Sequence, residues 1–211
     1  MSNITIICGH FGSGKTEIAI NLALKRGIGA TILDLDIVNP YFRTNDLRGF
    51  LEKKGIKVLS PKFANTNLDL PALPKEVLGI FSNKSPAIID LGGDPVGARV
   101  LGRFFEFFKN IKYSMYYVIN LSRPETDTIS KAISMMKEIE KATNLKITHL
   151  VNNTHLCEFT TKKLLYDSFN AVKELSFLTK LPYLYTFVTN KFLNLGIPNA
   201  VPLELYLKLP F

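Results

Sequence analysis

Short apolar runs alternate with stretches of helical period along the whole chain. Runs of strand length, rich in Ile, Val, Leu and Tyr, occupy residues 3–8, 30–36, 56–59, 87–91, 114–120, 146–152 and 184–188. Several of them are almost continuously apolar, which is typical of strands covered on both faces. Strands that alternate with helices form repeated β-α units. We therefore predict a three-layer α/β/α fold with a mostly parallel sheet of about seven strands.

Two of the intervening helices are well marked by their periodicity. The first runs from Lys15 to about Arg26 and is followed by Gly27, a common stop signal. The second covers residues 127–142, where apolar residues recur at helical spacing. Both apolar stripes are expected to face the core.

The length and composition of the chain favour one domain over residues 1–211. The chain has 211 residues and is 46% hydrophobic, enough for one sizeable core. No shift in composition marks a linker. The least regular stretch is residues 61–74, rich in Pro and Asn, which would form either a lid or simply a long loop.

The net charge of +8 is compatible with several kinds of partner. A nucleic acid, an acidic protein, a membrane surface and a cradle for phosphates would all suit it. The basic residues are scattered in ones and twos, however, without the block or stripe typical of nucleic-acid binding. A solvated surface is the preferred interpretation, and we expect neither nucleic acid nor membrane as a partner.

The two cysteines, Cys8 and Cys157, lie far apart and suggest neither a disulfide framework nor a metal site. The amino terminus has no basic segment typical of a signal peptide, and no apolar run approaches the roughly 18 residues of a membrane span. These features predict a cytoplasmic protein.

Residues 9–16 read GHFGSGKT and satisfy the phosphate-loop pattern G-x-x-x-x-G-K-[ST]. The pattern follows a predicted strand and opens a predicted helix, which is the context the chemistry needs. Glycines let backbone N–H groups turn toward phosphate oxygens, and the helix start adds a positive dipole end. We predict that the phosphates lie against Gly9, Gly12, Ser13 and Gly14. Lys15 would reach the β- and γ-phosphates, and the Thr16 hydroxyl would bind Mg²⁺.

Acidic residues end two of the other predicted strands. Asp34 and Asp36 lie on one face at the end of the second strand, and Asp90 ends the fourth. Ligands of open α/β sheets bind at the carboxyl ends of strands. We predict that Asp90 holds Mg²⁺ through water, that Asp34 supports the metal and that Asp36 orients an attacking water. Each of these carboxylates also has a plainer interpretation as a strand-end turn residue.

The glycine turn after Asp90 suggests a nucleotide switch. The N–H of Gly93 would approach the γ-phosphate, and residues 92–99 would then be ordered by a triphosphate and released after hydrolysis.

Together, the phosphate loop, Asp34-x-Asp36, Asp90 and Gly93 resemble the MinD/ParA branch of P-loop NTPases, which includes partition ATPases and CobQ/CobB-type enzymes. The resemblance implies ATP and Mg²⁺ as ligands, and often a homodimer that encloses ATP and switches on hydrolysis. It also makes Asn152, after the sixth strand, the expected adenine contact. A guanine-reading Asn-Lys-x-Asp is absent, since residues 190–193 read NKFL. ATP is therefore favoured over GTP.

One position departs from the family pattern. Members with the deviant loop carry a lysine after the first glycine, which reaches the partner's nucleotide, and here that position is His10. Arg43 and Arg99, each beside a predicted switch, would be alternative sources of positive charge, although surface pairing is the plainer interpretation.

Two further segments are candidates for contact with a partner. In residues 100–108, apolar side chains spread over more than one face of a predicted helix, which favours core packing but also fits an exposed patch. Residues 201–211 alternate apolar and polar side chains with period two between prolines, so a terminal strand or docked tail is expected there.

The leading hypothesis from the sequence is an Mg²⁺-dependent ATPase that acts as a switch. Two alternatives stay open. One is an ATP-dependent small-molecule kinase or ligase with an acceptor pocket near residues 61–74, and the other is a nucleotide-sensing module that does not hydrolyse.

Overall fold

The computed structural model describes residues 3–36, 47–60, 75–82, 85–93 and 95–207, together with the backbone but not the side chains of residues 95 and 96. The predicted loop 61–74 and Arg43 lie outside the described residues.

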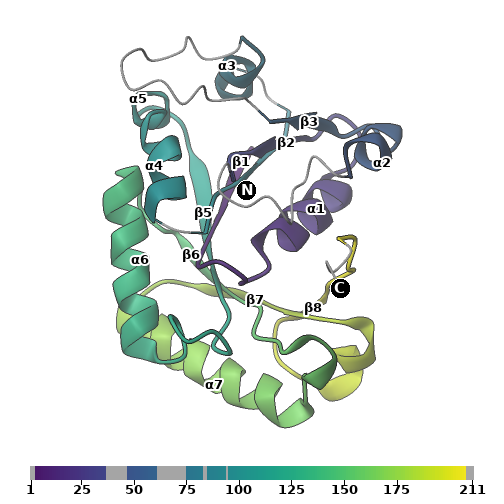
Figure 1. Cartoon of the computed structure of the whole chain (residues 1–211), viewed down its shortest axis with the longest axis vertical. Helices are drawn as coiled ribbons and strands as arrows, with labels where there is room; N and C mark the ends of the chain where they lie inside the picture. Colours follow the sequence, from purple (N-terminus) through teal and green to yellow (C-terminus); the bar gives the residue numbers. More distant parts are fainter. Residues whose placement is uncertain (1–2, 37–46, 61–74, 83–84, 94, 208–211) are drawn as a thin grey trace.

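A parallel eight-stranded sheet forms the middle of the molecule (Figure 1). Its strand order is β3-β2-β4-β1-β5-β6-β7-β8, and each neighbouring pair is parallel. The strands are β1 (Ile4–Cys8), β2 (Thr31–Asp34), β3 (Lys57–Leu59), β4 (Ala87–Asp90), β5 (Tyr113–Ile119), β6 (His149–Asn152), β7 (Tyr183–Val188) and β8 (Ala200–Pro202). Because β4 and β5 flank β1 on opposite sides, the loop after β1 emerges at the centre of the sheet.

The predicted fold class is confirmed, and the sheet gains one strand. β8 continues the sheet beside β7, at the start of the segment expected to be a terminal strand or docked tail. Pro202 ends this edge strand, a position where proline is tolerated because no further ladder bond is needed. β6 is shorter than predicted because the N–H groups of Lys146 and Ile147 donate to the side chains of Tyr113 and Glu140.

Helices cover both faces of this sheet. They are α1 (Lys15–Arg26), α2 (Arg48–Lys53), α3 (Lys75–Ser82), α4 (Pro95–Gly102), α5 (Phe105–Phe108), α6 (Ile129–Thr143) and α7 (Lys162–Thr179), with short 3₁₀ helices η2 (Cys157–Phe159) and η3 (Asn190–Leu195). α1 is found where it was predicted. α6 begins two residues later than predicted because Thr128 is its cap, with a hydroxyl that accepts the Lys131 N–H.

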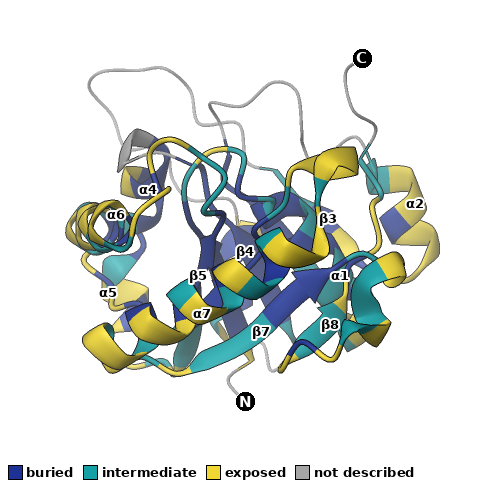
Figure 2. Ribbon diagram, turned by 90° about the horizontal axis from the view of Figure 1, so that it is seen from below, coloured by how far each residue is buried: buried dark blue, intermediate teal, exposed yellow. Residues whose placement is uncertain are grey.

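The alternation of side chains along β1 divides the core into two layers. Ile4, Ile6 and Cys8 face the layer formed with α3 to α7, while Ile7 faces the layer formed with α1 and α2. Figure 1 shows α4, α5 and α6 on the opposite side of the sheet from α1 and α2. In Figure 2 the strands are largely buried while the outer helix faces are exposed. This is the three-layer arrangement expected of apolar parallel strands.

The aromatic segment 100–108 packs mainly into the core, but not as one helix. α4 ends at Gly102 and α5 begins at Phe105, so the prediction of one helix through residues 100–108 was wrong. Phe104 and Phe108 are buried and contact Phe81 of α3, whereas Phe107 is 38% exposed. Core packing therefore accounts for most of the aromatic excess.

Residues 203–207 after β8 are held against α1 by two of its side chains. The Glu17 carboxylate accepts the N–H groups of Tyr206, at 3.1 and 3.0 Å, and of Leu207, at 2.8 Å. Asn21, one turn later, exchanges two hydrogen bonds with the backbone of Glu204. The Tyr206 ring lies 5.6 Å from that of Phe50 in α2. The tail thus joins α1 to α2.

Among the described residues, no helix has the length and apolar character needed to cross a bilayer. Cys8 and Cys157 are not disulfide-bonded.

Replacing Glu17 with Ala should release the tail, because three backbone hydrogen bonds lose their acceptor. Hydrogen bonds to a charged group contribute roughly 1.5–3 kcal/mol, and partial exposure places the expected loss of unfolding free energy at about 1–2 kcal/mol. Urea denaturation would measure this loss, with faster amide exchange at Tyr206 and Leu207. Glu138→Ala on the exposed side of α6 is the matched control, and equal exchange of these two amides in both variants would contradict the docking.

Candidate functional site

The loop between β1 and α1 has the shape expected of a phosphate cradle. Gly14 adopts a left-handed conformation with φ of 84°, and α1 begins at the next residue. The carbonyl oxygen of His10 accepts the Ser13 N–H at 3.2 Å and the Lys15 ammonium at 3.1 Å. The side chains of Ser13, Lys15 and Thr16 are all buried. These two hydrogen bonds to the His10 carbonyl close the loop at the start of α1.

Neighbouring strands approach this loop so closely that only glycine fits. A Cβ on Gly9 would lie 2.3 Å from the carbonyl oxygen of Val118 in β5. A Cβ on Gly93 would lie 2.6 Å from Cα of Phe11 and 2.9 Å from Nζ of Lys15. The structure therefore brings Gly93 against the phosphate loop, as its predicted role requires. Whether its N–H meets a γ-phosphate stays a prediction.

The three predicted carboxylates gather at the same edge of the sheet. Asp34 ends β2 and Asp90 ends β4, and the two residues are register partners on adjacent strands. The Asp36 N–H donates to Asp34 Oδ1 at 3.1 Å, and Asp36 Oδ1 lies 3.5 Å from where a Cβ on Gly92 would be. All three side chains are buried.

Asp90 is the most unusual of these groups. Its residue is 1% exposed, and neither carboxylate oxygen has a hydrogen-bond partner among the described residues. Burial and the Asp34 carboxylate raise its pKa to about 8, while the Lys15 ammonium and the Thr16 hydroxyl lower it. The Thr16 hydroxyl is near enough to stabilise the charged form, but neither oxygen has a donor at ordinary hydrogen-bond geometry in the described part of the chain, and such a buried carboxylate is costly unless a cation or a proton completes it.

Mg²⁺ fits this arrangement. It prefers oxygen ligands, keeps several waters and takes one or two carboxylates. Asp90 supplies buried oxygens with no other partner, and Thr16 and Asp34 lie close enough to influence its pKa. These are the three predicted metal residues, and the structure brings them together.

Four residues near the loop were not predicted from the sequence. Asn120 and Arg123 follow β5, and Asn153 and His155 follow β6; three of them contact the carbonyl groups or glycines of the loop directly. The available signal was their position at the carboxyl ends of β5, the neighbour of β1, and of β6, the next strand along, which applies to any polar residue there.

Asn152, the expected adenine contact, has no exposed surface. Its amide nitrogen donates to Ser168 Oγ at 3.0 Å, and its oxygen accepts the Thr154 N–H at 3.0 Å. Contact with a base would require the release of both bonds.

His10, where the resemblance to MinD/ParA proteins predicts a lysine, turns toward the loop after β5. Its Nδ1 lies 2.9 Å from the Phe11 carbonyl oxygen and 3.9 Å from a Glu125 carboxylate oxygen. Arg99 is exposed on α4.

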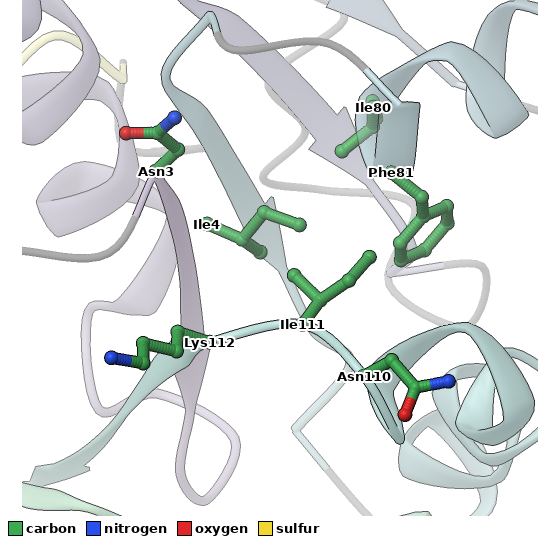
Figure 3. Close-up of a pocket in the computed structure, with 7 residues that line it drawn as sticks. All are labelled: Asn3, Ile4, Ile80, Phe81, Asn110, Ile111 and Lys112. Carbon is green, nitrogen blue, oxygen red and sulfur yellow. The ribbon is translucent and has the colours of Figure 1, made fainter.

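A shallow pocket of about 370 Å³ lies at the opposite, amino-terminal edge of the sheet (Figure 3). Its lining residues are Asn3, Ile4, Ile80, Phe81, Asn110, Ile111 and Lys112. Because it lies where β1 begins rather than ends, it is separate from the phosphate loop.

Comparisons with solved structures identify the fold. FtsY from Thermotoga maritima, a cell division protein, matches with a TM-score of 0.59 and 17% identity over 88% of this chain and 61% of that one. FtsY from Mycoplasma mycoides matches with a TM-score of 0.58 and 15% identity over 90% and 61%. The signal recognition particle receptor FtsY from Elizabethkingia anophelis, in complex with GDP, matches with a TM-score of 0.55 and 17% identity over 90% and 58%.

These identities show the fold alone, which is the three-layer P-loop NTPase fold. The chain spans about three fifths of the length of these FtsY structures. They do not single out the MinD/ParA branch. No protein-family model matches the sequence, and no curated protein matches it.

Asp90→Asn should stabilise the metal-free protein. Since the pKa of Asp90 is about 8 when folded and 3.8 ordinarily, the folded state holds a proton that the unfolded state loses, and stability falls as pH rises from about 4 to 8. Asn avoids this loss, so the variant's advantage should grow over that range and level off above it, at a few kcal/mol, roughly 2–4 °C in Tm for each kcal/mol. Thermal melts in EDTA from pH 5 to 9 measure it, and a variant less stable than wild type at pH 9 would overturn the assignment.

Proposed function

We propose that this protein binds a nucleoside triphosphate with Mg²⁺ and hydrolyses it, and that the change in nucleotide state alters the segment that follows β4. The observation that carries the proposal is the buried carboxylate of Asp90, which has no hydrogen-bond partner among the described residues and lies beside Lys15 and Thr16 of the phosphate loop. A buried carboxyl whose ionised form is strongly disfavoured in the folded state is typical of functional sites.

Each predicted residue has a defined task in this proposal. Gly9, Gly12, Ser13 and Gly14 form the cradle, and the Lys15 ammonium leaves its bond to the His10 carbonyl for the β- and γ-phosphates. Thr16 and Asp90 hold the metal with support from Asp34. Bound Mg²⁺ supplies charge neutralisation between the phosphates. Asp36 orients the attacking water.

Phosphoryl transfer of this type relies on positioning and charge stabilisation, so the site needs no histidine base. The reaction adds water across the β–γ phosphoanhydride bond and yields the diphosphate and inorganic phosphate.

The preferred base is proposed to be adenine. The absence of an acidic residue at Leu193, within NKFL, supports this choice. The GDP complex of FtsY from Elizabethkingia anophelis makes guanine the competing assignment. Asn152 would need to leave its bonds to Ser168 and Thr154 to read either base, so neighbouring residues of the β6–α7 loop deserve equal scrutiny in a base-specificity screen.

Lys15→Ala should weaken triphosphate binding by at least roughly tenfold and abolish turnover, because the one buried cation of the loop is lost. Fluorescent ATP and GTP analogues would give affinities, and phosphate release would give turnover. Lys25→Ala, at the far end of α1, is the control. Equal affinity of the Lys15 and Lys25 variants for both nucleotides would refute the proposed site. Tight binding by the wild type without phosphate release would instead indicate a nucleotide sensor.

A further inference from the structure

We infer that Asn153 and Arg123 are positioning residues for the phosphate loop: Asn153 aims the Gly14 N–H at phosphate, and Arg123 fixes the Gly12 carbonyl and places a positive charge beside the loop. The inference rests on the proposed function, since it concerns the same nucleotide site. Neither residue belongs to the G-x-x-x-x-G-K-[ST] pattern, and they come from two different loops.

Two consecutive carbonyl groups of the loop are held by side chains. The Gly12 carbonyl oxygen accepts from Arg123 Nε at 3.1 Å and from Asn120 Nδ2 at 3.4 Å. The Ser13 carbonyl oxygen accepts from Asn153 Nδ2 at 2.8 Å. The phosphate loop, residues 9–16, thus has fixed hydrogen-bond partners outside its own sequence.

The planarity of the peptide bond converts these bonds into an orientation of donors. The carbonyl of one residue and the N–H of the next lie in one plane and point in opposite directions. Fixing the Gly12 carbonyl therefore fixes the Ser13 N–H, and fixing the Ser13 carbonyl fixes the Gly14 N–H. The Ser13 N–H is already bonded to His10, so Gly14 is the more informative donor.

The same contacts explain why the two loop positions are glycines. A Cβ on Gly14 would lie 2.2 Å from Asn153 Nδ2, and a Cβ on Gly12 would lie 2.9 Å from Arg123 Nε. Both glycines also have positive φ, of 84° and 71°. Only a backbone without side chains allows the two donors to come this close.

The supporting side chains are themselves held firmly by the sheet. Asn120 is fully buried, and its Oδ1 accepts the N–H groups of Ser122 and His155. The Asn153 N–H donates to the Ile119 carbonyl oxygen at 2.8 Å, and its side chain is buried. The Arg123 N–H donates to the Asn120 carbonyl oxygen. β5 lies next to β1, and β6 lies next to β5, so the loops that follow these two strands emerge at the same edge of the sheet as the phosphate loop (Figure 1).

Arg123 adds a charge as well as a hydrogen bond. Its guanidinium lies against Gly12. The loop itself has His10 at the position where the MinD/ParA proteins that it resembles carry a lysine. A fixed positive charge beside an anion site increases its attraction for phosphate.

The test uses paired substitutions that separate geometry from charge. Asn153→Ala removes the donor to Ser13, and Asn153→Asp replaces it with an acceptor that repels the carbonyl. Arg123→Gln removes the charge and Arg123→Lys keeps it while losing the planar Nε donor. Arg103→Gln and Asn110→Ala, both exposed and remote from the loop, are the matched controls.

Affinity for ATP and GTP analogues and for pyrophosphate should fall roughly three- to tenfold in Asn153→Ala and Arg123→Gln, and further in Asn153→Asp. The loss should be the same in Mg²⁺ and in EDTA, because the N–H groups contact phosphate rather than metal. An Asp90→Ala variant should show its loss only in Mg²⁺. If Asn153 and Arg123 had a merely structural role, their substitution would lower the melting temperature, and the loss of affinity would not differ from that of Asp90→Ala in its dependence on Mg²⁺.

A second readout needs no nucleotide. The amide resonance and hydrogen exchange of Gly14 in the nucleotide-free protein should change in Asn153→Ala and stay unchanged in Asn110→Ala. If the Gly14 amide and pyrophosphate affinity are both unaltered, the inference is wrong although the proposed function stands. If the wild type binds no nucleotide, the proposed function fails, and an altered Gly14 amide would still support the positioning role within the loop.

Discussion

The close packing of the phosphate loop against the backbones around it is the constraint on which the site depends. Gly9 meets β5 and Gly93 meets the loop at Phe11, in each case at distances that exclude a Cβ. Real side chains at these places would force the strands or the loop apart. The parallel sheet makes this packing possible, because its central strand has neighbours on both sides and all their carboxyl ends lie at one edge. The phosphate loop, the three carboxylates and the side chains that donate to the loop therefore lie together at this edge of the sheet.

The charges gathered there are arranged for binding rather than for stability. Lys15 and Asp90 are both buried, and burial raises the pKa of Asp90 toward neutrality despite the nearby ammonium. An apolar pair of the same volume would cost less free energy to bury. A site that leaves a carboxylate without donors is intelligible when a cation completes it. Burial also raises the pKa of Glu17, but the backbone N–H groups of the tail donate to its carboxylate and lower that pKa. Glu17 therefore has a structural role.

The sequence predicted the fold class, and it predicted that Asp34, Asp36 and Asp90 lie at one edge of the sheet, because both signals are local. Apolar strands are visible as short runs, and an acidic residue at the end of such a run lies at the ligand edge whatever the rest of the chain does. β8 was less visible, since three residues ending in proline carry little periodic information. The break between α4 and α5 was missed because apolar residues continue through it on more than one face.

Other parts of the site depend on tertiary contacts that no local pattern contains. Asn152 and Asn153 are adjacent and chemically identical, yet one bonds Ser168 of α7 and the other bonds the phosphate loop. A shift of one residue at the end of a strand reverses which of them faces the loop, and the sequence alone does not fix that register. The same holds for Arg123, which becomes a partner of Gly12 only because β5 lies beside β1.

The contact between Gly93 and the phosphate loop also bears on how nucleotide state would reach the surface. Lys15 Nζ lies where a Cβ on Gly93 would almost touch it, and α4 begins two residues later. Movement of the ammonium from the His10 carbonyl to a phosphate would change the room available to Gly93. α4 in turn packs tightly on α6, with Gly102 close to the Ala142 carbonyl oxygen. The contacts of Gly93 with the phosphate loop and of Gly102 with α6 would link the nucleotide site to the helical layer, because packed helices shift between discrete positions rather than deform continuously.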